Sequence, residues 1–187
     1  MTHPVNAGEL ADWLAAAGID TTVWGENGAK HIEDLWQEIQ QGDCRLLDGP
    51  PRRDVSVVEV VLRRGNRVLL ELGQTLRDGQ TRHRNRPPSE KLKPGEDARG
   101  GAMRCLQEEL EVSADGVQEL TLNQTPTITD RDSPSYPGLP TRYIVYTATA
   151  VVPGLPDGDF WRENTATEQS DPVLRHQWGW REPPLED

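Results

Sequence analysis

One amphipathic helix between β-rich segments constrains the fold of this chain more than any other feature. Met103, Leu106 and Leu110 recur at helical spacing and predict a buried face for residues 97–110. On both sides of this segment the chain is dense in β-branched residues, first from Val55 onward and again from Thr141 to Val152. Strands on both sides of a central helix predict an α/β fold with a mixed sheet on which helices pack.

The first fifty residues have a different pattern, which predicts two short amphipathic helices. Gly18 and Gly42 stand where the two patterns stop, as helix ends often require. Two prolines beside a glycine then predict a linker in residues 49–54. We therefore expect a helical extension over residues 1–50 and one α/β domain over residues 54–182. The apolar positions at helical spacing are Leu10, Trp13, Leu14 and Ala17, then Ile32, Leu35, Trp36 and Ile39.

Further strands are predicted from β-branched and aromatic runs. Gly65 and Asn66 separate two such runs and predict a hairpin turn. VQELTL, TRYIVYTATAVV and HQWGWRE predict later strands. Residues 74–96 are rich in Arg, Gly, Asp and Pro and predict a long loop, and the proline-rich segments SPSYPGLP and 153–172 predict irregular structure.

Charge and apolar patterning exclude several classes of function. A formal charge of −11 and a pI near 4.8 repel a nucleic-acid backbone, so nucleic acid is disfavoured as a partner. No apolar run approaches the roughly 20 residues that span a bilayer, and the N-terminus lacks the pattern of a signal peptide. We expect a cytoplasmic protein without a membrane partner. Cys44 and Cys105 have no metal-type spacing, and we expect both thiols to be reduced.

A second face of the predicted helix carries Cys105, Glu108 and Glu109. Residues three and four apart are neighbours on a helix, so this face clusters acidic groups. Adjacent carboxylates repel one another unless a cation or an arginine lies between them. The face therefore predicts either a divalent-metal site or a solvated helix face in an acidic protein.

The same segment resembles the Nudix box of hydrolases that act on nucleoside diphosphates linked to another moiety. That box has the form G-x5-E-x7-R-E-U-x-E-E-x-G-U, where U is a bulky aliphatic residue. The preceding PSEKLKPGE is similar to the glycine-rich entry of the family. The residues in register with the box are Glu96, Arg104, Leu106, Glu108, Glu109 and Val112.

The resemblance implies a fold, an activity and a cofactor. The fold would be the Nudix α/β/α sandwich with a mixed sheet from about Val55 to Arg181, with the N-terminal helices outside it. The activity would be hydrolysis of a diphosphate linkage with Mg²⁺ or Mn²⁺. By the same resemblance, Glu96 and Arg104 orient the site, and Glu108 and Glu109 are metal ligands, with Glu109 essential for catalysis. A further glutamate beyond the box often serves as base, for which Glu168 is the first candidate and Glu163 the second.

The segment departs from the box at three positions, and two of them, Cys105 and Glu90, support a second hypothesis. Cys105 occupies the place of a carboxylate ligand, and a neutral thiol cannot replace it for magnesium. Glu90 replaces the first glycine and could supply a compensating carboxylate, while Glu111 replaces the last glycine. The alternative to a hydrolase is therefore a catalytically impaired Nudix-fold module with a ligand-binding or regulatory role.

Basic residues indicate where an anionic ligand would bind. Arg82, Arg84 and Arg86 lie just before the box, where they could contact phosphate oxygens or could instead pair with surface acids. Arg142 and Tyr143 begin a predicted strand and could add an anion contact and an aromatic wall, with core packing as the alternative for Tyr143. We expect a small phosphorylated, nucleotide-like ligand. A homodimer is left open by the sequence.

Overall fold

The chain forms two structural units, each built from segments distant in sequence. The computed structural model describes residues 4–26, 28–164 and 173–182. The first unit comprises Met1–Val57, Lys91–Glu96 and Pro126–Val145, and the second comprises Val58–Glu90, Asp97–Thr125 and Tyr146–Asp187. These limits do not separate residues 1–50 from 54–182, and the predicted domain boundaries stay a prediction.

The first unit contains the two predicted N-terminal helices, which are confirmed. Helix α1 spans Ala7–Ala16 and begins where the Asn6 side chain accepts a hydrogen bond from the Glu9 backbone. Helix α2 spans Ile32–Gln41 and ends at Gly42, whose φ of 76° lies in the left-handed region. Strand β1 (Arg45–Leu47) pairs antiparallel with β2 (Arg52–Arg64), and β7 (Thr127–Ser133) pairs antiparallel with β8 (Tyr136–Val151).

The helices of the first unit share one hydrophobic core with its strands. Leu10 and Leu14 of α1 and Leu35 of α2 are fully buried in the same cluster as residues of β2 and β8. Tyr136 is buried against Trp24, with ring centroids 5.1 Å apart. The strand members of this cluster are Val55, Tyr136 and Leu139.

A buried ion pair lies in the same unit. Arg53 Nη2 donates a 2.6 Å hydrogen bond to Glu38 Oε2, and both side chains are almost fully buried. Lys30 and Lys91 approach the other carboxylate oxygen to 2.9 and 3.1 Å. Burial alone would raise the pKa of Glu38, but the attraction of Lys91, Arg53 and Lys30 outweighs it and lowers the pKa to about 2.

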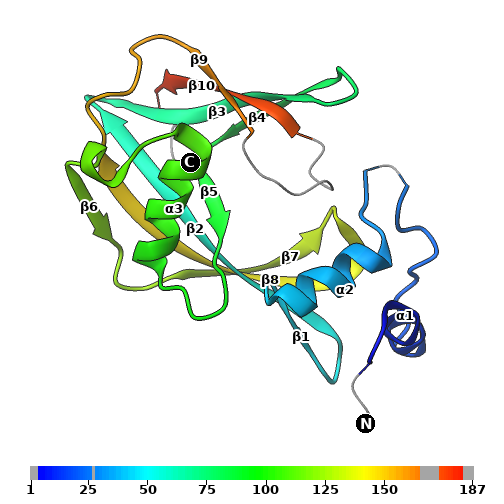
Figure 1. The fold of residues 1–187 in the computed structure, drawn as a ribbon. Helices are drawn as coiled ribbons and strands as arrows, with labels where there is room; N and C mark the ends of the chain where they lie inside the picture. Colours follow the sequence, from blue (N-terminus) through cyan, green and yellow to red (C-terminus); the bar gives the residue numbers. More distant parts are fainter. Residues whose placement is uncertain (1–3, 27, 165–172, 183–187) are drawn as a thin grey trace. The chain divides into compact units, whose positions relative to one another are not determined.

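The second unit contains a sheet region and the helix α3 (Figure 1). The sheet order is β6-β8-β2-β3-β10-β9, with β4 paired to β3 and β5 to β2. The expected hairpin at Gly65 is confirmed, because Arg64 and Arg67 are paired across it. The remaining elements are β3 (Arg67–Leu76), β4 (Thr81–Arg86), β5 (Ser89–Lys91), α3 (Ala98–Leu110), the short helix η1 (Ala114–Gly116), β6 (Glu119–Leu122), β9 (Phe160–Glu163) and β10 (Val173–Arg181).

Contacts within the second unit place α3 beside the sheet, and the α/β class is confirmed. Arg99 donates to the carbonyl of Leu120 on β6, and Arg162 on β9 donates to the carbonyl of Leu110 at the end of α3. Among the described residues, no helix is long and apolar enough to cross a membrane.

Three irregular segments that the sequence predicted are in fact partly strands. The presumed loop 74–96 contains β4 and β5, and the segment 153–172 contains β9. The proline-rich SPSYPGLP was also interpreted wrongly, because β8 begins at Tyr136 and includes Pro137 and Pro140. Proline has a fixed φ and no amide donor, so a strand tolerates it where that donor would have no ladder partner.

Candidate functional site

Helix α3 carries the acidic residues of the box and is fixed at both ends. Asp97 caps it by accepting a 2.7 Å hydrogen bond from the Gly100 backbone. Leu106 and Leu110 are buried, as the helical spacing predicted, but Met103 is only partly so. The helix ends at Glu111, whose φ of 57° is left-handed. The final glycine of the box therefore corresponds to a position that needs this backbone conformation, and here a glutamate adopts it.

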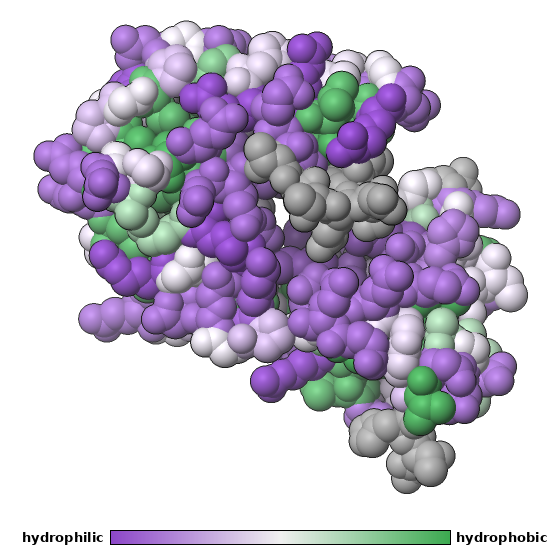
Figure 2. Space-filling view, in the orientation of Figure 1, coloured by the Kyte–Doolittle hydropathy of each residue, from purple (hydrophilic) through white to green (hydrophobic). Residues whose placement is uncertain are grey.

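Arg104 lies between two of the candidate metal ligands. Its Nη1 is 3.1 Å from Glu108 Oε2, one turn further along α3, and 3.5 Å from Glu90 Oε2 on β5. The side chain of Glu90 therefore points toward α3, and Glu90 and Glu108 share the guanidinium of Arg104. In the view of Figure 2 the surface over α3 and β5 is largely hydrophilic.

Cys105 is fully buried beneath these acids. Its pKa is raised well above the ordinary value, first by burial and then by Glu109, Glu90 and Glu108, which together outweigh Arg104. The thiol is therefore neutral at physiological pH and cannot act as an anionic ligand. Three carboxylates nevertheless surround the position that a fourth occupies in the Nudix box.

The types of residue around Cys105 suit a divalent cation. Their positions in this structure suit it less well. Carboxylate oxygens are the ligands that Mg²⁺ and Mn²⁺ prefer. In the part of the chain that the structure describes, however, no three His, Cys, Asp or Glu residues stand together at metal-binding spacing. Two of the three carboxylates are engaged by Arg104. A cation would have to compete with this guanidinium, so the residues fit in type but would bind weakly.

Glu109 faces a buried histidine that the sequence did not indicate. Nδ1 of His176 on β10 lies 3.6 Å from Glu109 Oε2 and 2.7 Å from Oε1 of Glu71 on β3. Glu71 and His176 are both buried. Burial raises the pKa of Glu71, but hydrogen bonds from His176 and Arg84 outweigh it and the net shift is downward. Because an ionised carboxylate only accepts, Nδ1 of His176 donates to Glu71.

The basic strand β4 joins the same network. Arg84 Nε donates a 3.0 Å hydrogen bond to Glu71 Oε2, and Arg82 donates to the side chain of Gln74. Gln74 in turn donates a 2.5 Å hydrogen bond to Glu71. The structure therefore brings two of the three predicted arginines to the side of the sheet where Glu109 lies. Arg86, the third, is close enough to the partly buried Glu59 to oppose the rise in its pKa that burial causes.

Three other predicted site residues, Glu96, Arg142 and Tyr143, belong to the first unit. Glu96 accepts a 2.9 Å hydrogen bond from the Lys93 backbone. Arg142 forms a two-fold hydrogen bond with Asp130, at 2.7 Å each, and Tyr143 packs beneath the guanidinium of Arg131. Glu168 lies outside the described residues. Glu163 ends β9 and pairs in register with Arg175.

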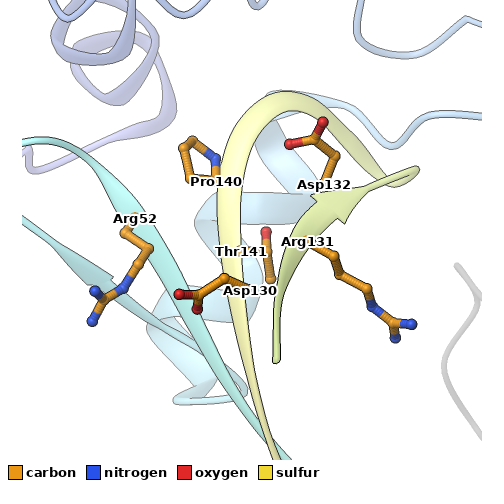
Figure 3. A pocket seen from close by; sticks show the side chains of 6 residues that line it. All are labelled: Arg52, Asp130, Arg131, Asp132, Pro140 and Thr141. Carbon is orange, nitrogen blue, oxygen red and sulfur yellow. The ribbon is translucent and has the colours of Figure 1, made fainter. Parts of the chain in front are cut away.

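A recess of about 280 Å³ in the first unit is lined by both positively and negatively charged residues. The guanidinium groups of Arg52 and Arg131 point away from each other (Figure 3), and Asp130 is bound by Arg142. Its other lining residues are Asp132, Pro140 and Thr141. This recess is therefore a poorer candidate for a phosphate site than the network of the second unit.

Comparisons with known proteins gave distant structural similarity only. No protein-family model and no curated protein matches the chain. Among solved structures, a Nudix hydrolase of Nitrosomonas europaea is 18% identical, with a TM-score of 0.42 over 67% of this chain and 72% of the other. An Ap4A hydrolase of C. elegans is 18% identical, with a TM-score of 0.38 over 69% and 79%. A Nudix-family hydrolase of Clostridium perfringens is 16% identical, with a TM-score of 0.37 over 68% and 80%.

Proposed function

We propose that the chain is a metal-dependent hydrolase of a diphosphate linkage in a nucleoside diphosphate linked to another moiety. The observation that carries the proposal is the network in the second unit that runs from Arg84 through Glu71 and His176 to Glu109. It joins a basic strand, suited to phosphate oxygens, to the acidic helix of the Nudix-like box. We expect this hydrolase to bind a small phosphorylated ligand and to act in the cytoplasm.

Each group has a role that follows from its chemistry. Glu108, Glu109 and Glu90 would hold Mg²⁺ or Mn²⁺, and such an ion supplies polarisation of the phosphate and activation of water. Arg84 keeps about a third of its side chain exposed while Glu71 fixes its Nε. A guanidinium held in this way is preorganised for an anionic oxygen. Arg104 contacts the carboxylates of Glu90 and Glu108 and offsets part of their charge.

A second candidate is favoured by a specific observation. Cys105 is a buried neutral thiol at a ligand position, and Arg104 already contacts both Glu90 and Glu108. These features suit a module that keeps the anion-binding strand but has lost efficient catalysis. Such a module would bind the same class of ligand without turning it over.

The test is release of phosphate or nucleotide from nucleoside diphosphate sugars, dinucleotide cofactors and nucleoside triphosphates, with Mg²⁺ or Mn²⁺ and with EDTA. Metal-dependent release supports the hydrolase. Saturable binding of a panel member without release supports the binding module. Folded protein that neither binds nor cleaves any of them contradicts both.

A further inference from the structure

Gln74 is a buried polar side chain of β3 that the Nudix-like box does not account for. It follows Glu71 by three residues, and residues three apart on a regular strand point to opposite faces. The pairing of β3 with β10 shifts at this place, so that Leu72 is an extra residue on β3. This bulge brings Gln74 and Glu71 to the same side of the sheet, where a 2.5 Å hydrogen bond joins them.

The two partners of Gln74 fix the orientation of its amide. The ionised carboxylate of Glu71 only accepts hydrogen bonds, so the amide nitrogen of Gln74 faces it. The guanidinium of Arg82 only donates, and its Nε bonds the amide oxygen of Gln74. A reversed amide would set donor against donor and acceptor against acceptor. Gln74 therefore links a carboxylate to a guanidinium in a single orientation.

Arg82 and Arg84 are held by separate acceptors. Gln74 accepts from Nε of Arg82, and Glu71 accepts from Nε of Arg84. The two arginines are two residues apart on β4, so their backbone positions are roughly 7 Å apart and their side chains leave the same face. Arg82 is exposed and Arg84 is about one-third exposed, so a ligand can reach both. Because each Nε is tied to its own acceptor, the two guanidinium groups are held apart.

We propose that Arg82 and Arg84 form a clamp for the two phosphate groups of a diphosphate, and that Gln74 positions Arg82 in this clamp. The inference rests on the proposed function, because it assigns part of the diphosphate recognition of that site to protein groups. A guanidinium matches phosphate oxygens in a bidentate manner. A diphosphate offers one phosphate group to each arginine, whereas orthophosphate has only one to offer. The clamp therefore selects a diphosphate over a single phosphate group.

Binding of inorganic pyrophosphate and of orthophosphate to the full chain tests the clamp, measured by calorimetry in EDTA at constant ionic strength. We expect the wild type to bind pyrophosphate at least about tenfold more tightly than orthophosphate. Arg82→Met should reduce this preference to about threefold or less. Arg67→Met removes an exposed arginine at the other end of β3 and is the matched control, with the preference unchanged. Equal affinities in the wild type, or a full preference in Arg82→Met, would overturn the clamp.

Gln74→Met tests whether Gln74 acts through Arg82. Methionine has a similar size but makes neither hydrogen bond, so we expect the affinity for pyrophosphate to fall about three- to tenfold, because Arg82 is no longer held. In the Arg82→Met background the same substitution should have no further effect. Gln80→Met changes an exposed glutamine between β3 and β4 and should leave the affinity unchanged.

An equal loss from Gln74→Met in both backgrounds would assign the effect to the sheet as a whole and would overturn the positioning role. If Gln74→Met does not fold, Gln74→Asn replaces it in the same cycle, because the shorter amide cannot reach both partners. The same two outcomes then decide the role of Gln74.

The absence of metal from these measurements separates the clamp from the proposed function. A wild type that prefers pyrophosphate in EDTA but releases nothing from the substrate panel with metal would keep the clamp and contradict the hydrolase. A wild type that releases product with metal but has no preference for pyrophosphate in EDTA would keep the hydrolase and overturn the clamp.

Discussion

Arg104 Nη1 lies 3.1 Å from Glu108 Oε2, one helical turn further along α3. This arginine also reaches Glu90 on β5 at 3.5 Å, so the protein itself balances part of the negative charge of the acidic face. Like charges on one helix face otherwise destabilise it. Repulsion within the acidic cluster is thus reduced without a metal ion, and the effect of a carboxylate at position 105 can be tested.

Cys105→Glu should restore that carboxylate at a cost in stability. A buried charge beside Glu109, Glu90 and Glu108 is unfavourable in metal-free protein, so we expect the melting temperature to fall. Added Mn²⁺ should raise it again, and by more than in the wild type. Cys105→Gln has the same size without the charge and is the matched control. Equal stabilisation of both variants by Mn²⁺ would contradict a metal site at this position.

Glu111→Gly should stabilise the chain. The left-handed backbone at position 111 costs a non-glycine residue strain that glycine avoids, so we expect a gain of about 1 kcal/mol in the free energy of unfolding. The lost contact with Arg162, at 3.3 Å and half exposed, is worth less. Glu111→Gln removes the charge and keeps the strain. If this control stabilises the chain as much as the glycine, charge rather than backbone strain is the cause.

Glu38 should make stability depend on pH in acid. Its pKa is about 2 in the folded chain against an ordinary value of 4.5, so between these values the unfolded state binds more protons. Stability from Glu38 is therefore complete above about pH 4.5 and is lost as the pH falls toward 2, by about 3 kcal/mol in total.

Urea unfolding of wild type and Glu38→Gln at pH 6 and pH 2.5 isolates this effect. At pH 6 the variant should be the less stable, because Arg53 loses its buried charge partner. The two should converge at pH 2.5. A stability difference that does not change with pH would show that Glu38 is not the titrating group.

Both thiols should resist modification in the folded chain. Cys44 and Cys105 are buried, and burial raises the pKa of each. Because the thiolate is the reactive form, we expect a thiol reagent at pH 8 to label neither until urea unfolds the protein. Labelling at the rate of a free thiol before unfolding would contradict the burial of that cysteine.

Sequence patterns predicted the elements whose apolar residues recur at fixed spacing. The helices and the hairpin at Gly65 show such spacing, and the structure contains them. β4 and β7, in contrast, read TRHRNR and TITDRDS and expose most of their side chains. Strands of this kind are held by backbone hydrogen bonds to β3 and β8, which leave no apolar alternation in the sequence.

Only the part of the candidate site whose residues lie close together in the sequence could be predicted. The acids of α3 stand three or four residues apart, so their clustering follows from helix geometry. Glu71 and His176 are 105 residues apart and meet only because β3 and β10 pair. The one signal for them was an acid within the apolar strand RVLLEL, since a buried charge requires a partner.

Metal-dependent release from the substrate panel, compared between wild type and Glu109→Gln, tests the central claim most directly. Glu109 is the residue at which the box helix and the buried network of the second unit meet. The account predicts Mn²⁺- or Mg²⁺-dependent release by the wild type, and a loss of at least about 100-fold in the variant while its fold is retained. Equal release by both proteins would contradict the assignment of the site.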